Sequence, residues 1–320
     1  MAAGGAALVE HDRGTRGVSG AVAWPIKFQI GARTLFAVRR RLVRVPLELD
    51  DVLGGRVPVL PPLPTGAAGW SVTSLPEALV EAVRPGGGIT YLRQRYTRYH
   101  TDLSGTHAGW LGGLSGNARS GLKRKTKKLA EANGGTLDVR TYRSGDEMAV
   151  FHALARGVAA RTYQEKLLGA GLPDDPAFVA GMRAKAAAGE AFGWLLCVND
   201  VAIAYLYCPM TGGDVRYDYV GHDPAWNDWS PGSVLHAEAF ATLFADPAAR
   251  RFDFTEGEGQ HKRQFSSAGT ACVDLLLLRP GWTNRALVAA LRGFNQMVES
   301  AKTARDWPVV GRLVDRVRRG

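Results

Sequence analysis

The sequence has no run of apolar residues long enough to cross a membrane. Its longest strand-like apolar run, residues 273–278, contains Asp274, whereas a membrane helix needs about 18 apolar residues in succession. The N-terminus is small and polar, and it lacks the basic start and apolar stretch of a secretory signal. We therefore expect a cytoplasmic protein with a disordered leader over residues 1–24.

Cysteine is scarce. The three cysteines, Cys197, Cys208 and Cys272, lie in strand-like apolar runs and share no short metal-ligand spacing. An odd and sparse set of this kind fits a reducing compartment, where cysteine acts as a small buried hydrophobe.

The signatures of several enzyme classes are also missing. The chain has no Walker sequence, no Rossmann fingerprint and no nucleophile with an adjacent base in sequence. His152, His222 and His236 lack neighbours at metal-ligand spacing, so we expect no metal. If the protein transfers a chemical group, direct attack of the acceptor on the activated donor is thus favoured over a covalent enzyme intermediate.

Positive charge is abundant and unevenly placed. The formal net charge is +10, and residues 119–128 hold six bases and no acid, while residues 281–320 hold eight bases and three acids. Further arginines cluster at residues 39–44 and 93–98. Such segregation favours an anionic partner, which leaves a nucleotide, a phosphorylated acceptor, RNA and an acidic membrane surface open.

The first third of the chain predicts a small α+β unit over residues 25–114. Strands are expected at residues 26–30 and 34–43 around a turn at Gly31, and a third at residues 89–96. Residues 75–83 have helical spacing, and the proline-rich residues 57–64 interrupt regular structure.

A basic helix should open the next domain, residues 115–280. Ser115 can cap a helix that runs to about Asn133, with the six bases around its polar face. Beyond it, periodicity and turn signals predict the order β-α-α-β-β-β-α-β-α-β. These elements are expected at residues 137–141, 146–161, 176–189, 192–198, 201–208, 215–221, 232–245, 251–254, 260–266 and 271–279.

The tail, residues 281–320, predicts an amphipathic helix with a basic end. Its apolar stripe is Leu287, Leu291, Phe294 and Val298. The stripe can pack on the protein itself or lie on an anionic membrane, and the sequence leaves both readings open.

One candidate ligand site lies where a predicted strand gives way to a helix. Ser230 can cap this helix, Pro231 suits its first position, and Gly232 lets a ligand approach the backbone. Free N–H groups at a strand-to-helix junction such as Ser230–Ser233 attract a phosphate, although an ordinary well-capped helix would show the same residues.

Candidate catalytic residues follow in residues 252–262. Asp253 alternates with two phenylalanines in a strand covered on both faces, so its carboxylate needs a partner, for which Lys262 is the candidate. The two would form a structural ion pair or a catalytic pair. Glu256 and His261 can accept a proton from an amine or hydroxyl, or can be solvated loop residues.

A second group is a candidate for contact with the acceptor. Tyr163 and Gln164 fall between the two helices after the first strand, a position that borders the ligand side in this topology. They either grip the acceptor or solvate a loop.

A family resemblance rests on YDYVGHDPAWNDWSPGSVLHAEAF at 217–240 and RFDFTEGEGQHKRQF at 251–265. Together with residues 119–128 and 162–173, these strings resemble the CelD/BcsL-like, cellulose-biosynthesis branch of the GNAT acyltransferases, which is related to the Fem peptidyltransferases. The resemblance implies an α+β GNAT fold preceded by a reduced copy of itself, with the donor between splayed fourth and fifth strands.

The same resemblance implies roles for individual residues. Its matching polar positions are Ser230, Gly232 and Ser233 at the helix start, and Asp253, Glu256, Gly257 and Lys262 after the fifth strand. We predict that the first three bind the donor together with Tyr219, and that Asp253, Glu256 and Lys262 are catalytic. Arg124 and His261 are predicted to bind the acceptor. The chain departs from the family at Asn227–Gly232, where standard GNAT enzymes carry Gln/Arg-x-x-Gly-x-Gly/Ala for the pyrophosphate of coenzyme A.

These observations predict an acyltransferase. The leading hypothesis is transfer from acetyl-CoA or another acyl-CoA to an amine or hydroxyl of a phosphorylated sugar or similar exopolysaccharide precursor. The alternatives are a Fem-like enzyme that uses aminoacyl-tRNA and a non-catalytic scaffold whose basic tail contacts an anionic membrane.

Overall fold

The computed structural model of the protein describes residues 20–30, 33–162 and 171–305. The chain divides into two units that are interleaved in sequence. Unit 1 combines Met1–Tyr96 with Ala271–Gly320, and unit 2 is the continuous segment Thr97–Thr270. The predicted domains, divided at residues 115 and 280, stay a prediction.

Unit 1 is built on a sheet with the strand order β1-β2-β3-β11-β4. β1 and β2 are antiparallel, β2 and β3 parallel, and β3 and β11 antiparallel. The last residues of β4, from Thr97 on, and the first residues of β11, up to Thr270, belong to unit 2. The elements are β1 (Val22–Ile30), β2 (Arg33–Pro46), α1 (Leu49–Leu53), β3 (Gly69–Pro76), the 3₁₀ turns η1 (Glu77–Leu79) and η2 (Glu81–Val83), β4 (Ile89–Asp102), β11 (Ala268–Leu278) and α9 (Trp282–Arg305).

The C-terminal helix α9 covers one face of this sheet. Leu287 and Leu291 are buried in a cluster with Ile26 and Phe28 of β1, and the Phe294 ring meets Phe28 edge-on at 5.3 Å between centroids. Three of the four residues of the predicted stripe, Leu287, Leu291 and Phe294, therefore pack on the protein itself. Among the described residues no helix is long and apolar enough to cross a membrane.

Unit 2 continues with the strand order β4-β10-β8-β7-β6-β5, and β9 pairs with β7. Neighbouring strands are antiparallel except for β8 and β10, which are parallel. The further elements are α2 (His107–Gly113), α3 (Gly116–Ala132), β5 (Asp138–Tyr142), α4 (Gly145–Ala159), α6 (Pro176–Ala187), β6 (Ala191–Val198), β7 (Val201–Thr211), β8 (Asp214–Arg216), β9 (Tyr219–His222), η3 (Pro224–Trp229), α7 (Pro231–Ala245), β10 (Arg251–Asp253) and α8 (Gln260–Phe265).

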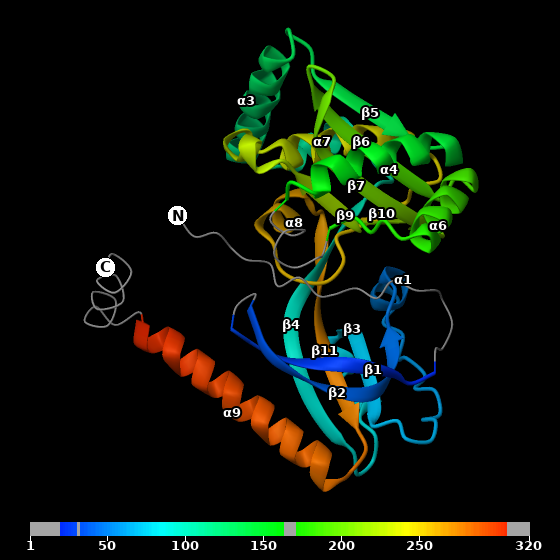
Figure 1. The fold of residues 1–320 in the computed structure, drawn as a ribbon, viewed down its shortest axis with the longest axis vertical. Coiled ribbons are helices and arrows are strands. Elements are labelled where there is room, and N and C mark those ends of the chain that lie inside the picture. The colour runs from blue at the N-terminus through cyan, green and yellow to red at the C-terminus, as the bar shows by residue number, and fades with distance from the viewer. Residues whose placement is uncertain (1–19, 31–32, 163–170, 306–320) are drawn as a thin grey trace. The chain divides into compact units, whose positions relative to one another are not determined.

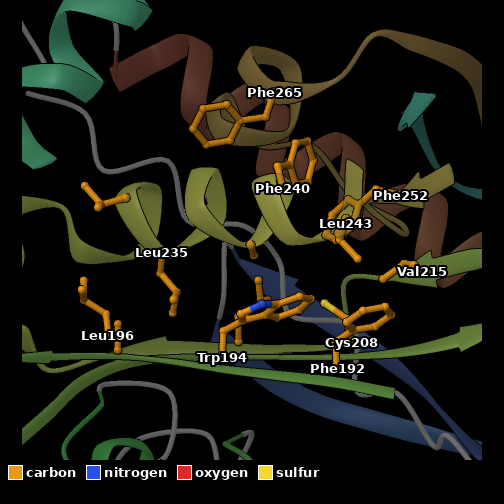
Figure 2. Close-up of a cluster of buried hydrophobic side chains, with 14 of the residues drawn as sticks. Phe192, Trp194, Leu196, Cys208, Val215, Leu235, Phe240, Leu243, Phe252 and Phe265 are labelled. Atoms are coloured by element: carbon orange, nitrogen blue, oxygen red, sulfur yellow. The ribbon is translucent and has the colours of Figure 1, made fainter. Parts of the chain in front are cut away.

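Helices cover both faces of this sheet (Figure 1). Every residue of β6 is buried, because its side chains alternate between two cores. Phe192, Trp194 and Leu196 point toward Leu235 and Phe240 of α7, as Figure 2 shows. The other face of the sheet packs against α4 and α6.

From β5 to β11 the predicted order of elements is confirmed, with small shifts of the boundaries and with one predicted strand divided into β8 and β9. The helix predicted from Ser115 is α3, and the Ser115 hydroxyl accepts a hydrogen bond from the Ala118 N–H at 3.2 Å. In unit 1 the strands at 26–30, 34–43 and 89–96 are confirmed, and all three are longer than predicted. β1 begins at Val22, inside the range predicted for the leader, whose residues 1–19 lie outside the described part of the chain.

Two predicted elements are wrong in detail. The helix expected at 75–83 is the end of β3 followed by two 3₁₀ turns. Leu75 precedes Pro76, which disfavours the helical conformation there. The single strand expected at 215–221 is broken into β8 and β9, because their pairing with β7 shifts by one residue around Tyr217 and Asp218. The sequence analysis also missed α1, β3, α2 and η3.

Candidate functional site

The break between β8 and β9 marks the point where this part of the chain stops pairing with β10. β8 pairs in parallel with β10 as far as Arg216 and Asp253, and the Tyr217 N–H then donates to the Asp253 carbonyl at 2.9 Å. β9 pairs with β7, and β10 ends at Asp253, where Thr255 adopts a positive φ of 60°. β9 and β10 therefore diverge beyond Tyr217. Helix α7 follows β9 along the chain, and helix α8 follows β10.

Asp253 lies at this point, but its partner is Arg98 rather than Lys262. Arg98 donates through Nη2 to Oδ2 at 2.6 Å and through Nε to Oδ1 at 3.2 Å, and both side chains are buried. The Thr255 N–H donates to Oδ1 at 2.8 Å. The predicted Asp253–Lys262 pair is wrong because β4 pairs with β10, which places Arg98 closer. Removing either partner of such a buried pair would leave the other charge uncompensated.

Lys262 instead bonds to the turn that precedes its helix. Its Nζ donates to the Glu256 backbone carbonyl at 2.5 Å, and 7% of the residue is exposed. Burial lowers the pKa of Lys262 to about 8, although the nearby Glu256 and Asp253 carboxylates oppose the shift. Lys262 therefore carries a proton at neutral pH and loses it within one or two pH units.

Two histidines and a tyrosine meet beside this lysine. The Tyr217 ring centroid lies 5.2 Å from that of His236 on α7 and 5.6 Å from that of His261 on α8. The Nε2 atoms of both histidines are buried and have no hydrogen-bond partner within the described residues. Burial lowers the pKa of His261 to about 4 and that of His236 well below its ordinary value, so both rings are neutral at pH 7.

The start of α7 differs from the predicted cap. Ser230 adopts the left-handed conformation, with φ 48° and ψ 54°, and its side chain makes no capping bond. Its backbone carbonyl accepts from the Ser233 and Val234 N–H groups at 3.0 and 3.4 Å. A Cβ on Gly232 would meet only His222 Nδ1, at 3.8 Å, so this side of the helix start is open.

The remaining predicted site residues are scattered. The Tyr219 ring packs edge-on against Phe178 at 5.3 Å, on the face of the sheet that α6 covers, opposite α7. Arg124 is exposed on α3. Tyr163 and Gln164 lie outside the described residues.

The basic helix α3 lies beside η3, which leads into α7. The Lys128 ammonium sits over the Trp229 ring, 4.2 Å from its centroid. Lys123, Arg124 and Lys127 are exposed along the helix, and Arg119 instead donates to the Leu114 carbonyl at 3.0 Å.

The structure thus brings the predicted residues Glu256, His261 and Lys262 together and adds Tyr217 and His236 to them. His236 connects α7 to Tyr217, and Tyr217 connects it to His261, so the beginning of α7 and the Glu256–Lys262 turn are close together. Among the described residues, no three His, Cys, Asp or Glu side chains are placed to hold a metal ion. The described residues thus bring together two histidine nitrogens, the Lys262 ammonium and the open side of Gly232.

Sequence reasoning missed Arg98, Tyr217 and His236. Arg98 comes from a strand 155 residues away from Asp253, and no local pattern indicates that pairing. His236 had a usable signal: it lies among Val234, Leu235 and Ala237, so a polar ring on the buried side of α7 could have been singled out.

Part of the chain matches a protein-family model. Residues 116–263 match the family model described as an acetyltransferase (GNAT) domain. The match runs from α3 to α8 and contains Tyr217, His236, Asp253, Glu256 and Lys262. No protein of curated function matched the sequence.

Solved structures of similar shape share little sequence with the chain. FemX superposes with a TM-score of 0.50 at 10% identity, covering 84% of this chain and 90% of FemX. A conserved protein of unknown function from Bacteroides thetaiotaomicron gives 0.47 at 12% identity (66% and 70% covered), and L-PGS from Bacillus licheniformis gives 0.44 at 12% (70% and 72%). The family match and the FemX superposition support a GNAT-like mixed α+β fold. The narrower CelD/BcsL-like assignment stays a prediction.

Proposed function

We propose that unit 2 is a GNAT-type acyltransferase domain that moves an acyl group from acyl-CoA to an amine or hydroxyl acceptor. The observation that carries the proposal is the divergence of β9 from β10 beside unpaired histidine nitrogens. In this proposal the donor would lie between the diverging strands, and the acceptor would lose its proton beside the histidines. The GNAT match of residues 116–263 supports the same reaction class.

The donor would lie toward the start of α7. Backbone N–H groups at a helix N-terminus favour a phosphate, and the side of Gly232 is open to one. The thioester carbonyl would then reach the Tyr217 region, because His236, on the second turn of the same helix, contacts that tyrosine.

The acceptor would lose its proton to His261 or Glu256. The acceptor nitrogen or oxygen attacks the thioester carbonyl, the C–S bond breaks, and the thiolate leaves as the proton passes to the base. His261 is neutral at pH 7, as a base must be, and its low pKa makes it a weak one, so Glu256 remains the alternative. The Lys262 ammonium would stabilise the oxyanion that develops on the carbonyl.

Asp253 has a positioning role in this proposal. Its bonds to Arg98 and to the Thr255 N–H fix the turn that leads to Glu256. The acceptor class, a sugar or sugar nucleotide of an exopolysaccharide or cell-envelope pathway, follows from the resemblance of residues 217–240 and 251–265 to the CelD/BcsL-like branch.

Isothermal titration with acetyl-CoA tests the donor. Gly232→Ala introduces a methyl with room in the free protein, yet it should weaken acetyl-CoA binding at least tenfold by blocking approach to the backbone. Gly181→Ala, in α6 and equally uncrowded, is the matched control and should bind as the wild type does. Absence of heat up to millimolar acetyl-CoA would count against acyl-CoA as the donor.

A second candidate is a Fem-like transferase that uses aminoacyl-tRNA. It is favoured by the exposed bases of α3 and by Lys128 over Trp229, because RNA binding combines basic and aromatic side chains. Binding of tRNA should then weaken with salt by roughly 0.7 to 0.9 logarithmic units per phosphate contact. Lys123→Gln/Arg124→Gln should lower that slope, and salt-insensitive binding would remove this candidate.

The third hypothesis, a non-catalytic membrane scaffold anchored by its tail, has less support. Leu287, Leu291 and Phe294 of the α9 stripe pack on the sheet of unit 1 and are therefore not free to enter a lipid surface.

A further inference from the structure

The hairpin of β1 and β2 extends beyond the sheet of unit 1. Only Leu42–Pro46 of β2 pairs with β3, so the preceding part of the strand pairs with β1 alone. An isolated two-stranded ribbon is at best marginally stable in water. Its distal end, shown in blue in Figure 1, therefore gains the most from a further contact.

Large apolar side chains gather at that distal end. Ile30, Leu35 and Phe36 are 49%, 48% and 53% exposed. Phe36 stacks on Phe28 at 4.3 Å, and Phe28 in turn meets Phe294 of α9. The apolar face thus begins under α9 and continues past it into solvent.

The ribbon is also strongly basic. Residues 22–46 contain six bases, Lys27, Arg33, Arg39, Arg40, Arg41 and Arg44, and no acid. Arg39 and Arg41 are exposed and pair with Pro25 and Ala23, in the alternation opposite to Phe28 and Phe36. One ribbon therefore presents apolar groups at its end and cations along its side.

We propose that the distal end of the β1–β2 hairpin binds an anionic membrane surface. Ile30, Leu35 and Phe36 enter the head-group region, while Arg39 and Arg41 lie against lipid phosphates. This combination of apolar insertion and positive charge is what interfacial binding requires. Nucleic acid would use the arginines but gain little from isoleucine and leucine, and a second copy of the same basic ribbon would be repelled. The proposal is independent of the acyl transfer.

Vesicle flotation of the full chain tests it. The protein should float with vesicles of phosphatidylcholine mixed with phosphatidylglycerol and not with phosphatidylcholine alone. Arg39→Gln/Arg41→Gln should weaken partitioning about thirtyfold, at roughly fivefold per basic group. Ile30→Ser/Leu35→Ser should weaken it on the order of tenfold, because both side chains are half exposed and leave the folded core intact.

Two matched variants control for charge and for surface hydrophobicity. Lys123→Gln/Arg124→Gln removes two exposed bases from α3, and Val59→Ser removes a side chain that is 90% exposed in unit 1. Both should float as the wild type does. Equal losses in the α3 variant would overturn the proposal in favour of non-specific charge attraction.

A local probe locates the contact. The three native cysteines are buried, so a polarity-sensitive dye can be placed on Ala37→Cys in the hairpin or on Ser120→Cys in α3, both at exposed positions. Only the hairpin dye should shift to the blue with anionic vesicles. Flotation without that shift, no flotation at all, or tRNA binding lost in the hairpin variants in place of vesicle binding would each contradict the proposal.

Discussion

Asp253 shows how much a single buried carboxylate depends on its neighbours. Its two oxygens accept from the Arg98 guanidinium and from the Thr255 N–H, and both partners are held within unit 2. Removing one member of a buried pair leaves the other charge without compensation, which is costlier than removing both.

We expect Arg98→Met to lower the free energy of unfolding by about 3–5 kcal/mol, because the Asp253 charge stays buried and unpaired. The double variant Arg98→Met/Asp253→Leu should recover most of the loss. Urea denaturation of the single and double variants measures this difference. Equal destabilisation in both would show that Arg98 acts through packing and not through its charge.

We expect the free energy of unfolding to depend on pH through His236. Its folded pKa lies well below the unfolded value of 6.5, mainly through burial and secondarily through His261. The unfolded chain therefore binds more protons below pH 6.5, so the stability contribution is complete above pH 6.5 and declines as the pH falls.

We expect His236→Phe to reduce the loss of stability between pH 6.5 and 5, because phenylalanine does not titrate and the site is already lined by aromatic rings. Thermal unfolding at several pH values measures it. An unchanged profile in His236→Phe would assign the acid sensitivity to other groups.

Among the elements, two helices of unit 2 begin with serine in different ways. Ser144 caps α4 with a full capping box, in which its hydroxyl accepts from the Glu147 N–H at 3.2 Å. Ser230 starts α7 in the left-handed conformation without a side-chain bond. The same residue type therefore stabilises one helix and strains the other.

We expect Ser144→Ala to cost about 1 kcal/mol and Ser230→Ala to change stability by less than about 0.5 kcal/mol. Ser230→Gly should stabilise by up to about 1 kcal/mol, because glycine adopts a positive φ without steric cost. Denaturation midpoints of the three variants test the contrast. Equal costs for both alanine variants would mean that Ser230 has a capping role after all.

The elements of unit 2 were largely predictable because each carries a local signal. Ser115 and Asp175 mark helix starts, and Asn199-Asp200 marks the turn between β6 and β7. The division of β8 from β9 was not predictable, since it arises from a one-residue shift in pairing with β7 that the apolar pattern conceals. The candidate site was predicted in part for the same reason: Glu256, His261 and Lys262 are neighbours in sequence, while Arg98 reaches Asp253 only through β4.

At the scale of the whole molecule, unit 1 is formed by the two segments that precede and follow unit 2 in the sequence. β11 pairs with β3 and supplies Val273, Leu275 and Leu277 to a core that also holds Val72 and Leu75. Unit 2 contains its own two cores within one continuous segment.

We expect the fragment 97–270 to fold alone and the fragment 1–96 to remain unfolded, because the latter lacks β11 and α9. Co-expression of 1–96 with 268–320 should restore its structure. Circular dichroism and amide hydrogen exchange of the purified fragments measure the outcome. A cooperatively folded 1–96 fragment would contradict the dependence on β11.

The split origin of unit 1 has a consequence for biosynthesis. As the ribosome advances, the first 96 residues emerge long before the strand that completes their sheet, whereas everything needed by Thr97–Thr270 is available once that segment has emerged. Folding during translation would therefore be completed for Thr97–Thr270 before it is completed for residues 1–96, contrary to the usual N-terminal-first order of domain folding. Until the last strand arrives, the nascent hairpin and its apolar neighbours are the part of the chain that most needs chaperone protection.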